Sequence, residues 1–385
     1  MHPLVEVGEL MARRSGSVDP SKFPDELFEL HSIPAFDAGR PELLRGNQIG
    51  SSKQIVQPND VMVSKIVPHI RRASVVGRAS EARQIASGEW IVFRSERVFP
   101  HYLRHVLVSE LFHAKFMATV SGVGGSLLRA RPAEVAKIKV PLPPILEQRR
   151  IAAILDKADA LRAKRREAIA KLNQLLQSVF LEMFGNPVTN PKGFPMGSIG
   201  DLLESVKYGS AEKAALQGDV PILRMNNLTY RGEMDLADLK YIGFDKADEK
   251  YTVRAGDILF NRTNSKELVG KTAVYDGPTP MAYAGYLVRA RTLPENAPEY
   301  ISAFMNSSYG KATLRAMCKS IVGMANINAR EFQTIAIAIP PRELQQKFQV
   351  QVAAIRRRKH VLSEQAIKMD SLFVSLQQQA FAGML

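Results

Sequence analysis

Two stretches of the chain alternate short apolar runs with turn residues, and each is followed by a long segment nearly free of glycine and proline. Within the alternating stretches, apolar runs predict strands over Asp60–Ile66, Glu89–Arg94 and Asp257–Asn261. Apolar positions three and four residues apart predict short helices over Tyr102–Ala118 and Glu299–Ala316. The intermixing of strands and helices indicates the α+β class, with two mixed α/β globular domains.

Each long segment follows a Pro-Pro pair, Pro143-Pro144 or Pro340-Pro341, and carries one apolar stripe. Proline is tolerated near a helix start because its missing N–H would have no partner there. The first stripe, interrupted only by Arg165, consists of Ile151, Ile154, Ala158, Leu161, Arg165, Ala168, Leu172, Leu175 and Val179. The second, interrupted only by Lys359, consists of Val352, Ile355, Lys359, Leu362, Ala366, Met369, Phe373 and Leu376.

Sustained 3-4 spacing is typical of a coiled-coil seam. A helix of about 40 residues is ~60 Å long, which is long for a surface helix of a small domain. An amphipathic helix packed on its own domain has the same spacing, but two such helices at equivalent places favour a pair. Because a whole domain separates them in the chain, we expect the two long helices to form an antiparallel coiled-coil spacer with the domains at opposite ends.

The chain also matches itself at a shift of 197 residues, which places Asp60 on Asp257. Further matches at this shift are Glu134 with Glu331, Ile138 with Ile335, Gln148 with Gln345, Leu175 with Leu372, Ser178 with Ser375 and Phe184 with Phe381. A constant shift over about 130 residues predicts two duplicated domains, because solenoid repeats are much shorter. The expected pseudo-twofold internal repeat comprises domains at 1–142 and 186–340 and spacer helices at 143–185 and 341–385.

Composition adds a preference for a polyanionic partner. The 385 residues include 52 Lys and Arg against 38 Asp and Glu, a formal net charge of +14. Such a balance favours nucleic acid, because each phosphate neutralised by Lys or Arg releases a counterion. The single cysteine, Cys318, excludes an internal disulfide framework and a cysteine-based zinc site. With no long apolar run and no secretory signal, we expect a soluble cytoplasmic protein without a membrane partner.

No motif indicates catalysis or a bound metal. Val269–Thr272 resembles the tail of a phosphate loop, but Ser265 stands where the loop needs its first glycine, so we interpret it as a turn into Ala273–Tyr275. The glycine-rich segment Gly122–Ser126 precedes no βαβ pattern. No Asn-Pro-Pro-aromatic or Asp-Pro-Pro-aromatic element is present, and Asp60 and Asp257 lack the acidic-x-Lys cluster of a nuclease. The histidines show no metal-ligand spacing.

A basic, duplicated chain with a rigid spacer suits a bipartite reader of duplex DNA. Two domains can enter grooves on one face of DNA when their separation matches the helical repeat of about 34–36 Å. The domains differ in detail, since Leu30–Asp37 opens the first and Ile222–Asn227 the second. The sequence therefore predicts two different half-sites and an asymmetric target.

Several segments resemble the specificity (S) subunits of type I restriction–modification systems. Pro141–Ala152, continuing to Leu175–Gly185, is similar to their central conserved region, and Gln377–Gly383 to their distal one. Further segments resemble two kinds of target recognition domain: Ser32–Asp37 and Asp60–Lys65 the first kind, Leu223–Asn227 and Asp257–Ser265 the second. The resemblance covers essentially the whole chain.

The resemblance implies a division of labour. The S subunit reads sequence, while two modification subunits dock around its helices, bind S-adenosylmethionine and flip an adenine in each half-site for N6 methylation. Two restriction subunits add ATP-driven translocation and cleavage. No cofactor is then expected in this chain, because S-adenosylmethionine, ATP and Mg belong to the partner subunits. The chain itself would be non-catalytic and would lie in the cytoplasm of a prokaryote.

Candidate DNA contacts are polar side chains that suit base edges or phosphates. In the first domain they come from a basic, apparently loop-like run and are Lys65, Arg71, Arg72, Arg78 and Arg83. In the second they are Arg224, Asn226, Asn227, Arg262, Thr263, Asn264 and Lys266. Each of these has a bland alternative as a solvated charge or a turn-capping Asn. Arg162, Lys164, Arg165 and Arg166 could contact spacer DNA, but we favour a solvated helix face or a docking surface for modification subunits.

Two other functions remain as alternatives. A structural coiled-coil adaptor between proteins would bind duplex DNA neither tightly nor in a salt-dependent way. A free-standing restriction or modification enzyme would turn over substrate alone, which the missing cofactor motifs disfavour.

Overall fold

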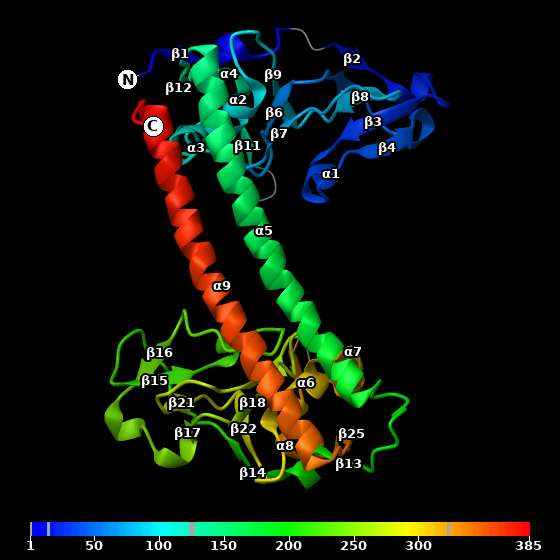
Figure 1. Ribbon diagram of the computed structural model, residues 1–385, viewed down its shortest axis with the longest axis vertical. Helices are drawn as coiled ribbons and strands as arrows, with labels where there is room; N and C mark the ends of the chain where they lie inside the picture. The colour runs from blue at the N-terminus through cyan, green and yellow to red at the C-terminus, as the bar shows by residue number, and fades with distance from the viewer. Residues whose placement is uncertain (1, 14–15, 123–127, 322–323) are drawn as a thin grey trace. The chain divides into compact units, whose positions relative to one another are not determined.

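The computed structural model describes residues 2–13, 16–122, 128–321 and 324–385, so most of the glycine-rich segment Gly122–Ser126 lies outside the described residues. The chain divides into two compact units, which we call unit 1 (residues 1–166 and 364–385) and unit 2 (residues 167–363). Each unit combines a globular part with one end of each long helix, α5 (Ile145–Phe184) and α9 (Arg342–Ala382) (Figure 1). The predicted mixed fold and both predicted long helices are confirmed.

The described residues of unit 1 form four small sheets. Its central sheet has the antiparallel order β7-β6-β9, and a five-stranded sheet has the order β2-β5-β8-β3-β4, in which only β3 and β8 run parallel. The third sheet pairs β1 (Leu4–Glu6) with β12 (Lys139–Pro141), so both ends of the globular part meet. The remaining strands are β2 (Ser17–Val18), β3 (Leu27–His31), β4 (Glu42–Arg45), β5 (Lys53–Ile55), β6 (Val61–Ser64), β7 (Ala73–Val75), β8 (Arg83–Ala86), β9 (Trp90–Phe93) and the short pair β10 (Val120–Ser121) with β11 (Arg129–Ala130).

The described residues of unit 1 also form four short α-helices: α1 (Ile33–Asp37), α2 (Pro100–Leu107), α3 (Glu110–Met117) and α4 (Pro132–Val135). The apolar residues of β6 and β9 pack against α2 and α3 in one core. The same core receives Ile151 and Leu155 from α5 and Phe373 and Phe381 from α9. Both long helices are therefore anchored in the core of unit 1 rather than attached to its surface.

Unit 2 has the corresponding parts. Its central sheet has the order β14-β22-β18-β20, a second sheet the order β16-β15-β21-β17, and β13 pairs with β25. A small three-stranded sheet, β19-β24-β23, corresponds to the pair β10-β11 of unit 1, since Thr263 pairs with Asn326 as Ile66 does with Arg129. The strands are β13 (Met196–Ser198), β14 (Leu203–Tyr208), β15 (Val220–Leu223), β16 (Lys240–Ile242), β17 (Thr252–Val253), β18 (Ile258–Asn261), β19 (Thr263–Asn264), β20 (Thr272–Val274), β21 (Met281–Tyr283), β22 (Leu287–Thr292), β23 (Lys319–Ile321), β24 (Met324–Asn326) and β25 (Ala336–Ala338).

The helices of unit 2 are α6 (Pro298–Asn306), α7 (Ser308–Met317) and α8 (Ala329–Gln333) (Figure 1). Residues of α6 and α7 share a core with the central sheet, as Phe304 and Leu314 do with Ile258. This core also receives Phe180 from α5 and Phe348 from α9, whose ring centroids lie 5.9 Å apart. The arrangement repeats the anchoring of the long helices in unit 1.

The two units share specific polar contacts at positions 197 residues apart. Arg94 donates to both carboxylate oxygens of Asp60 at 2.7 and 2.6 Å, and Arg291 does the same to Asp257 at 2.7 and 3.2 Å. These carboxylates also accept from the turn that precedes their strands, at 2.9 and 3.0 Å. The matching aspartates of the sequence thus fix equivalent strand starts.

A second shared contact joins each long helix to its globular part. Gln148 and Gln345 are both 1% exposed. The Gln148 side chain accepts from the Phe99 N–H at 2.7 Å and donates to the Pro143 carbonyl at 2.8 Å. Gln345 makes the same contacts with Ala297 at 3.0 Å and Pro340 at 3.0 Å. The Pro-Pro pair and the first helical turn are therefore held to the start of α2 or α6.

The strands predicted over Asp60–Ile66, Glu89–Arg94 and Asp257–Asn261 are confirmed as β6, β9 and β18. A single helix was predicted over Tyr102–Ala118 and another over Glu299–Ala316. Both predictions are wrong in this respect, because each segment forms two helices, α2 and α3 or α6 and α7. At the breaks, the hydroxyls of Ser109 and Ser307 accept the N–H groups of Phe112 and Gly310 and begin a new helix. Apolar spacing that continues across such a cap hides the break from the sequence.

Within each unit α5 and α9 run antiparallel. In unit 1, Arg150 reaches the Leu385 carbonyl at 2.5 Å and Arg162 reaches Asp370 at 2.6 Å. In unit 2, Lys359 contacts Asn173 at 2.7 Å, while Phe180 and Phe184 contact Phe348. The residue number on α9 thus falls as that on α5 rises.

The stripe predicted for α5 is partly wrong. Leu161 and Leu175 are 50% and 45% exposed, whereas Leu155 is fully buried and Arg162 is half-buried. Arg162 lies over the Phe373 ring at 4.2 Å, so a cation occupies an inward position that apolar spacing assigns to its neighbour. Every residue of the stripe predicted for α9 is buried or half-buried.

Candidate nucleic-acid interface

Three of the five candidate arginines and lysines of unit 1 are held by carboxylates. Arg72 is 9% exposed and donates to both oxygens of Asp37 at 2.7 and 2.8 Å, and this hydrogen bonding lowers the pKa of Asp37. Arg71 pairs with Glu110 at 2.5 Å. Arg83 pairs with Glu26 at 2.8 Å. These three side chains therefore form ion pairs within unit 1.

Arg83 also differs from its predicted setting. The run from Lys65 to Arg83 is not one loop, because it contains β7 and ends in the first residue of β8. The guanidinium lies over the Phe23 ring at 4.9 Å. Lys65 and Arg78, in contrast, lie between strands, and their side chains have no partner among the described residues. They are the candidates of unit 1 that remain available to a ligand.

In unit 2 the Arg224–Asn227 group forms a turn after β15. The Asn227 side chain is 1% exposed and donates to the Asp235 and Asp238 carbonyls at 2.8 and 3.1 Å. It also accepts from the Arg224 N–H at 2.9 Å, as expected of a turn-capping Asn. Arg224 pairs with Asp238 at 2.9 Å. Asn226 is exposed and has no side-chain partner among the described residues.

The other candidates of unit 2 lie on or beside β19. The Arg262 guanidinium lies over the Tyr208 ring at 4.8 Å, and Arg262 and Thr263 both donate to the Asn326 side chain, at 3.4 and 3.3 Å. Asn264 accepts from the Ser265 N–H at 2.9 Å. Lys266 is exposed, and, besides a backbone hydrogen bond, its charge is one of the causes that lower the pKa of Glu267.

The structure thus brings the candidates together in small groups rather than in one site. Thr263 and Asn264 form β19, with Arg262 directly before it, and Arg224, Asn226 and Asn227 share one turn. Two buried lysines of unit 2, Lys271 and Lys311, were not among the candidates. Their residue type is basic like the others, but burial of a lysine cannot be read from local sequence.

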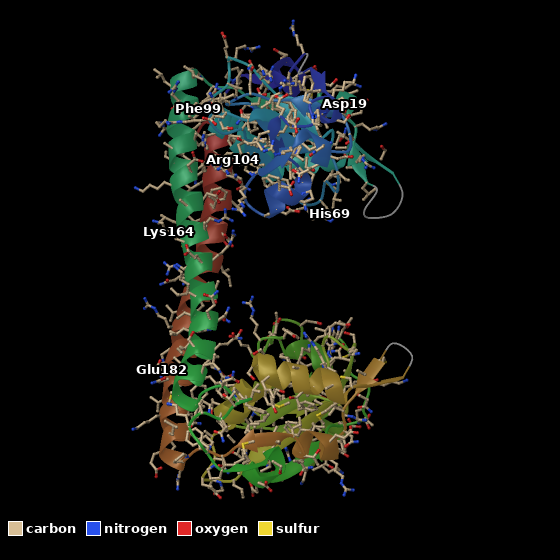
Figure 2. The ribbon with its side chains drawn as sticks, turned by 90° about the vertical axis from the view of Figure 1, so that its right-hand side faces the viewer. Asp19, His69, Phe99, Arg104, Lys164 and Glu182 are labelled. Carbon is tan, nitrogen blue, oxygen red and sulfur yellow. The ribbon has the colours of Figure 1, made fainter. Side chains whose placement is uncertain are left out.

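The long helices carry the remaining basic group. Arg162 pairs with Asp159 at 3.0 Å and with Asp370, and Arg166 reaches Asp370 at 3.0 Å. Lys164 is exposed on α5 (Figure 2). Only part of this basic group is therefore a solvated face.

A neighbouring polar cluster attaches the globular part of unit 1 to α5. Asp156 accepts from His105 at 2.7 Å and from Arg104 at 3.0 Å, and His101 lies at 3.0 Å (Figure 2 shows Arg104 beside α5). Burial alone would raise the pKa of Asp156, but these partners lower it overall. Burial, with Arg104 beside it, lowers the pKa of His105. The ring is therefore mainly neutral at pH 7.

The described residues hold no group of three or more His, Cys, Asp or Glu side chains that could bind a metal ion. The carboxylates of Asp60 and Asp257 form ion pairs with Arg94 and Arg291. Val269 and Gly270 lie in a turn and β20 begins at Thr272, which agrees with the predicted turn into Ala273–Tyr275. None of the described helices is both long and apolar enough to span a bilayer.

Comparison with known proteins identifies the family. A family model described as "Type I restriction modification DNA specificity domain" matches residues 38–174 and 191–350. The specificity subunit of the type I restriction enzyme EcoKI from Escherichia coli (strain K12) is 23% identical over 358 residues, covering 86% of this chain and 76% of that protein. The StySPI specificity subunit from Salmonella potsdam is 23% identical with the same coverage.

Solved structures show a similar fold. The S subunit of a type I restriction–modification system from M. genitalium is 11% identical, with a TM-score of 0.61 over 98% of this chain and 96% of that one. A chain from a study of complex assembly and conformational transition of the type I R-M system is 20% identical, with a TM-score of 0.60 over 100% of this chain and 98% of that one. Because the family model matches most of the chain in two segments, the chain belongs to the family of type I restriction–modification DNA specificity domains.

Proposed function

We propose that this chain is the DNA sequence-specificity subunit of a type I restriction–modification complex. In this proposal units 1 and 2 each read one half of an asymmetric, bipartite site in duplex DNA. The observation that carries it is the double match of the family's DNA specificity domain, once mainly in unit 1 and once within unit 2. The net charge of +14 suits a polyanionic target.

Different half-sites are supported by the different surfaces of the units. Unit 1 offers Lys65 and Arg78 from segments around β7, while unit 2 offers Asn226, Lys266 and the stacked Arg262. Arginine and asparagine can recognise guanine and adenine by paired hydrogen bonds, whereas lysine mainly holds phosphate. Two such sets would select different bases.

The long helices would act as the spacer and as the docking surface for modification subunits. In support, α5 continues over 40 residues and belongs to both units. Both helices also expose large apolar side chains, among them Leu161, Leu175, Ile367 and Leu372. Exposed apolar groups on helices that already have an inner apolar face suit contact with another protein.

The chain would be a non-catalytic member of the complex. Two modification subunits would bind S-adenosylmethionine and methylate adenine, and two restriction subunits would use ATP and Mg. The contribution of this chain would be to position those subunits on DNA, a role that suits a DNA specificity domain.

The test is to map adenine methylation across the host genome with and without the gene. We expect one bipartite, asymmetric motif to lose its methylation when the gene is deleted, and to regain it when the gene is restored. An unchanged map in cells that make active modification subunits would contradict the proposal. It would favour the alternative of a coiled-coil adaptor, which predicts no salt-dependent binding of duplex DNA by the assembled complex.

A further inference from the structure

Unit 2 contains a buried amine without a hydrogen-bond partner. Lys311 lies on α7 and is 9% exposed, and its Nζ contacts no hydrogen-bond acceptor among the described residues. Lys271 is buried nearby at the start of β20, but its Nζ donates to the Met225 carbonyl at 2.5 Å. Of these two buried lysines, Lys311 is therefore the one whose ammonium group donates no hydrogen bond to a described residue.

Other cations surround this amine, and one tyrosine covers it. The Nζ of Lys311 lies 4.4 Å from the centre of the Tyr230 ring, and Arg315, one helical turn further along α7, donates to the Tyr230 hydroxyl at 3.3 Å. Burial first, and then the charges of Lys271 and Arg315, lower the pKa of Lys311 to about 8. Among the described residues no carboxylate offsets this effect.

The cluster is costly for the fold. A buried ammonium group without a hydrogen bond is unfavourable, and two neighbouring cations add repulsion. With a pKa of about 8, Lys311 is still mostly charged at pH 7. The Tyr230 ring offsets only part of the cost, since one cation–π contact is weaker than the hydrogen bonds that a buried ammonium group loses. An anion between the three cations would remove the repulsion and supply the missing acceptor.

The cluster adjoins the candidate recognition turn of unit 2. Lys271 holds the carbonyl of Met225, which lies between the candidates Arg224 and Asn226. Tyr230 follows that turn and is 41% exposed, so it can be displaced from Lys311 without opening the core. Arg315 is exposed as well.

We propose that Lys271, Lys311 and Arg315 form a phosphate-binding site, closed by Tyr230 in the free protein and filled by a backbone phosphate of the half-site that unit 2 reads. The inference rests on the proposed function. On binding, Tyr230 moves aside and the phosphate oxygens accept from Lys311 and Arg315. The site then fixes the register of the turn on the duplex, while neighbouring residues contact bases.

The experiment uses the complex of this chain with its modification subunits. It measures how tightly this complex binds a DNA duplex that contains the motif found by methylation mapping, at salt concentrations between 50 and 200 mM. We expect Lys311→Met, which keeps the apolar stem, to weaken binding roughly five- to tenfold at 100 mM salt and to reduce the salt slope by about 0.9. Arg315→Met, at an exposed position, should reduce the slope similarly. The matched control is Lys192→Met, at an exposed lysine of unit 2 between α5 and β13, which should change neither quantity.

Three outcomes separate the possibilities. If Lys311→Met and Arg315→Met retain the wild-type slope, and Lys311→Met only raises the melting temperature, Lys311 is a structural residue and the site is refuted. If inorganic phosphate stabilises the wild-type chain but not Lys311→Met, while DNA binding is unchanged, the site takes a small anion and not DNA. If the wild-type complex itself does not bind the duplex, the proposed function is refuted. This result can be told apart from failure of the phosphate site, because it does not depend on any variant.

Discussion

At the scale of single residues, each unit is stabilised internally by buried polar groups. These groups are the same residue types at equivalent positions of the sequence repeat. Asp60 and Asp257 are 1% and 2% exposed, and each accepts a pair of hydrogen bonds from an arginine, Arg94 directly after β9 or Arg291 in β22. These hydrogen bonds raise the pKa of Arg94 and of Arg291. A carboxylate buried at a strand start therefore has a structural role here, although acidic residues at such places often invite a catalytic interpretation.

Removing one of these charges should destabilise only its own unit. We expect Asp257→Asn to lower the free energy of unfolding of unit 2 by about 2–4 kcal/mol, because the Arg291 guanidinium loses its buried partner. Hydrogen exchange resolved by peptide should show weaker protection in β18 and β22. Asp60→Asn is the matched control and should act on β6 and β9 instead. Loss of protection in both units from either variant would contradict the argument.

The histidines predict a difference in pH dependence between the units. Six of the seven histidines lie in unit 1, and burial lowers the pKa of His31, His105 and His113 below 6.5. Below about pH 6.5 the unfolded chain then binds more protons than the folded one, so the stability of unit 1 falls as the pH falls. The stability is fully present above that pH.

Hydrogen exchange at pH 7.5 and 5.5, corrected for the intrinsic exchange rate, tests this difference. Unit 1 should lose protection at the lower pH, and unit 2, whose one histidine is the exposed His360, should lose much less. His105→Gln should reduce the pH dependence of unit 1. Equal losses in the two units would show that buried histidines do not control the acid response.

At the scale of elements, the start of each long helix depends on one buried glutamine. Replacing Gln345 by Ala leaves the Ala297 N–H and the Pro340 carbonyl without their partner. We expect a loss of about 1–3 kcal/mol in the stability of unit 2, measured by urea unfolding, with faster exchange of the Ala297 amide. Gln351→Ala, at an exposed position of the same helix, should change stability by less than about 0.5 kcal/mol. Similar effects of both variants would contradict the role of Gln345.

The elements also show how far sequence reasoning reaches. The strands and long helices were predictable because their apolar runs and glycine-free lengths are local signals. The inward face of α5 was less predictable, because Arg162 can face inward over Phe373 while Leu161 stays exposed. Spacing counts apolar residues and cannot recognise a cation that packs on a ring.

The candidate site was predictable in composition but not in detail. Arg72 and Asn227 have suitable residue types for DNA contact, yet both are buried and hydrogen-bonded within their unit. Whether a polar side chain is free depends on partners far away in sequence, such as Asp37 for Arg72. Lys311 illustrates the opposite case, since its missing partner is visible only in three dimensions.

At the scale of the whole molecule, the units share a scaffold and differ in the second sheet that each one carries. The shared contacts join the central strands and the long helices to each globular part. The differing parts are the second sheets, which have five strands in the order β2-β5-β8-β3-β4 in unit 1 and four in the order β16-β15-β21-β17 in unit 2. If the units read half-sites, a change of bases read should therefore be possible without altering the helices that join them.

The helices themselves should then control the gap between the half-sites. One heptad inserted between Arg166 and Glu167, with another between Ser363 and Glu364, lengthens both helices at the boundary between the units. Seven residues add about 10 Å of helix, and with about 34–36 Å per 10–10.5 base pairs this corresponds to roughly three base pairs. A heptad nearly preserves the facing sides, since it turns the helix by only about 20° from two full turns. Methylation mapping should therefore show the same half-site bases with a longer gap, or no methylation if the wider spacing cannot be accommodated.

The control is a heptad inserted into α5 alone, which mismatches the paired helices and should abolish methylation. Altered half-site bases with an unchanged gap would refute the role of the helices as the spacer.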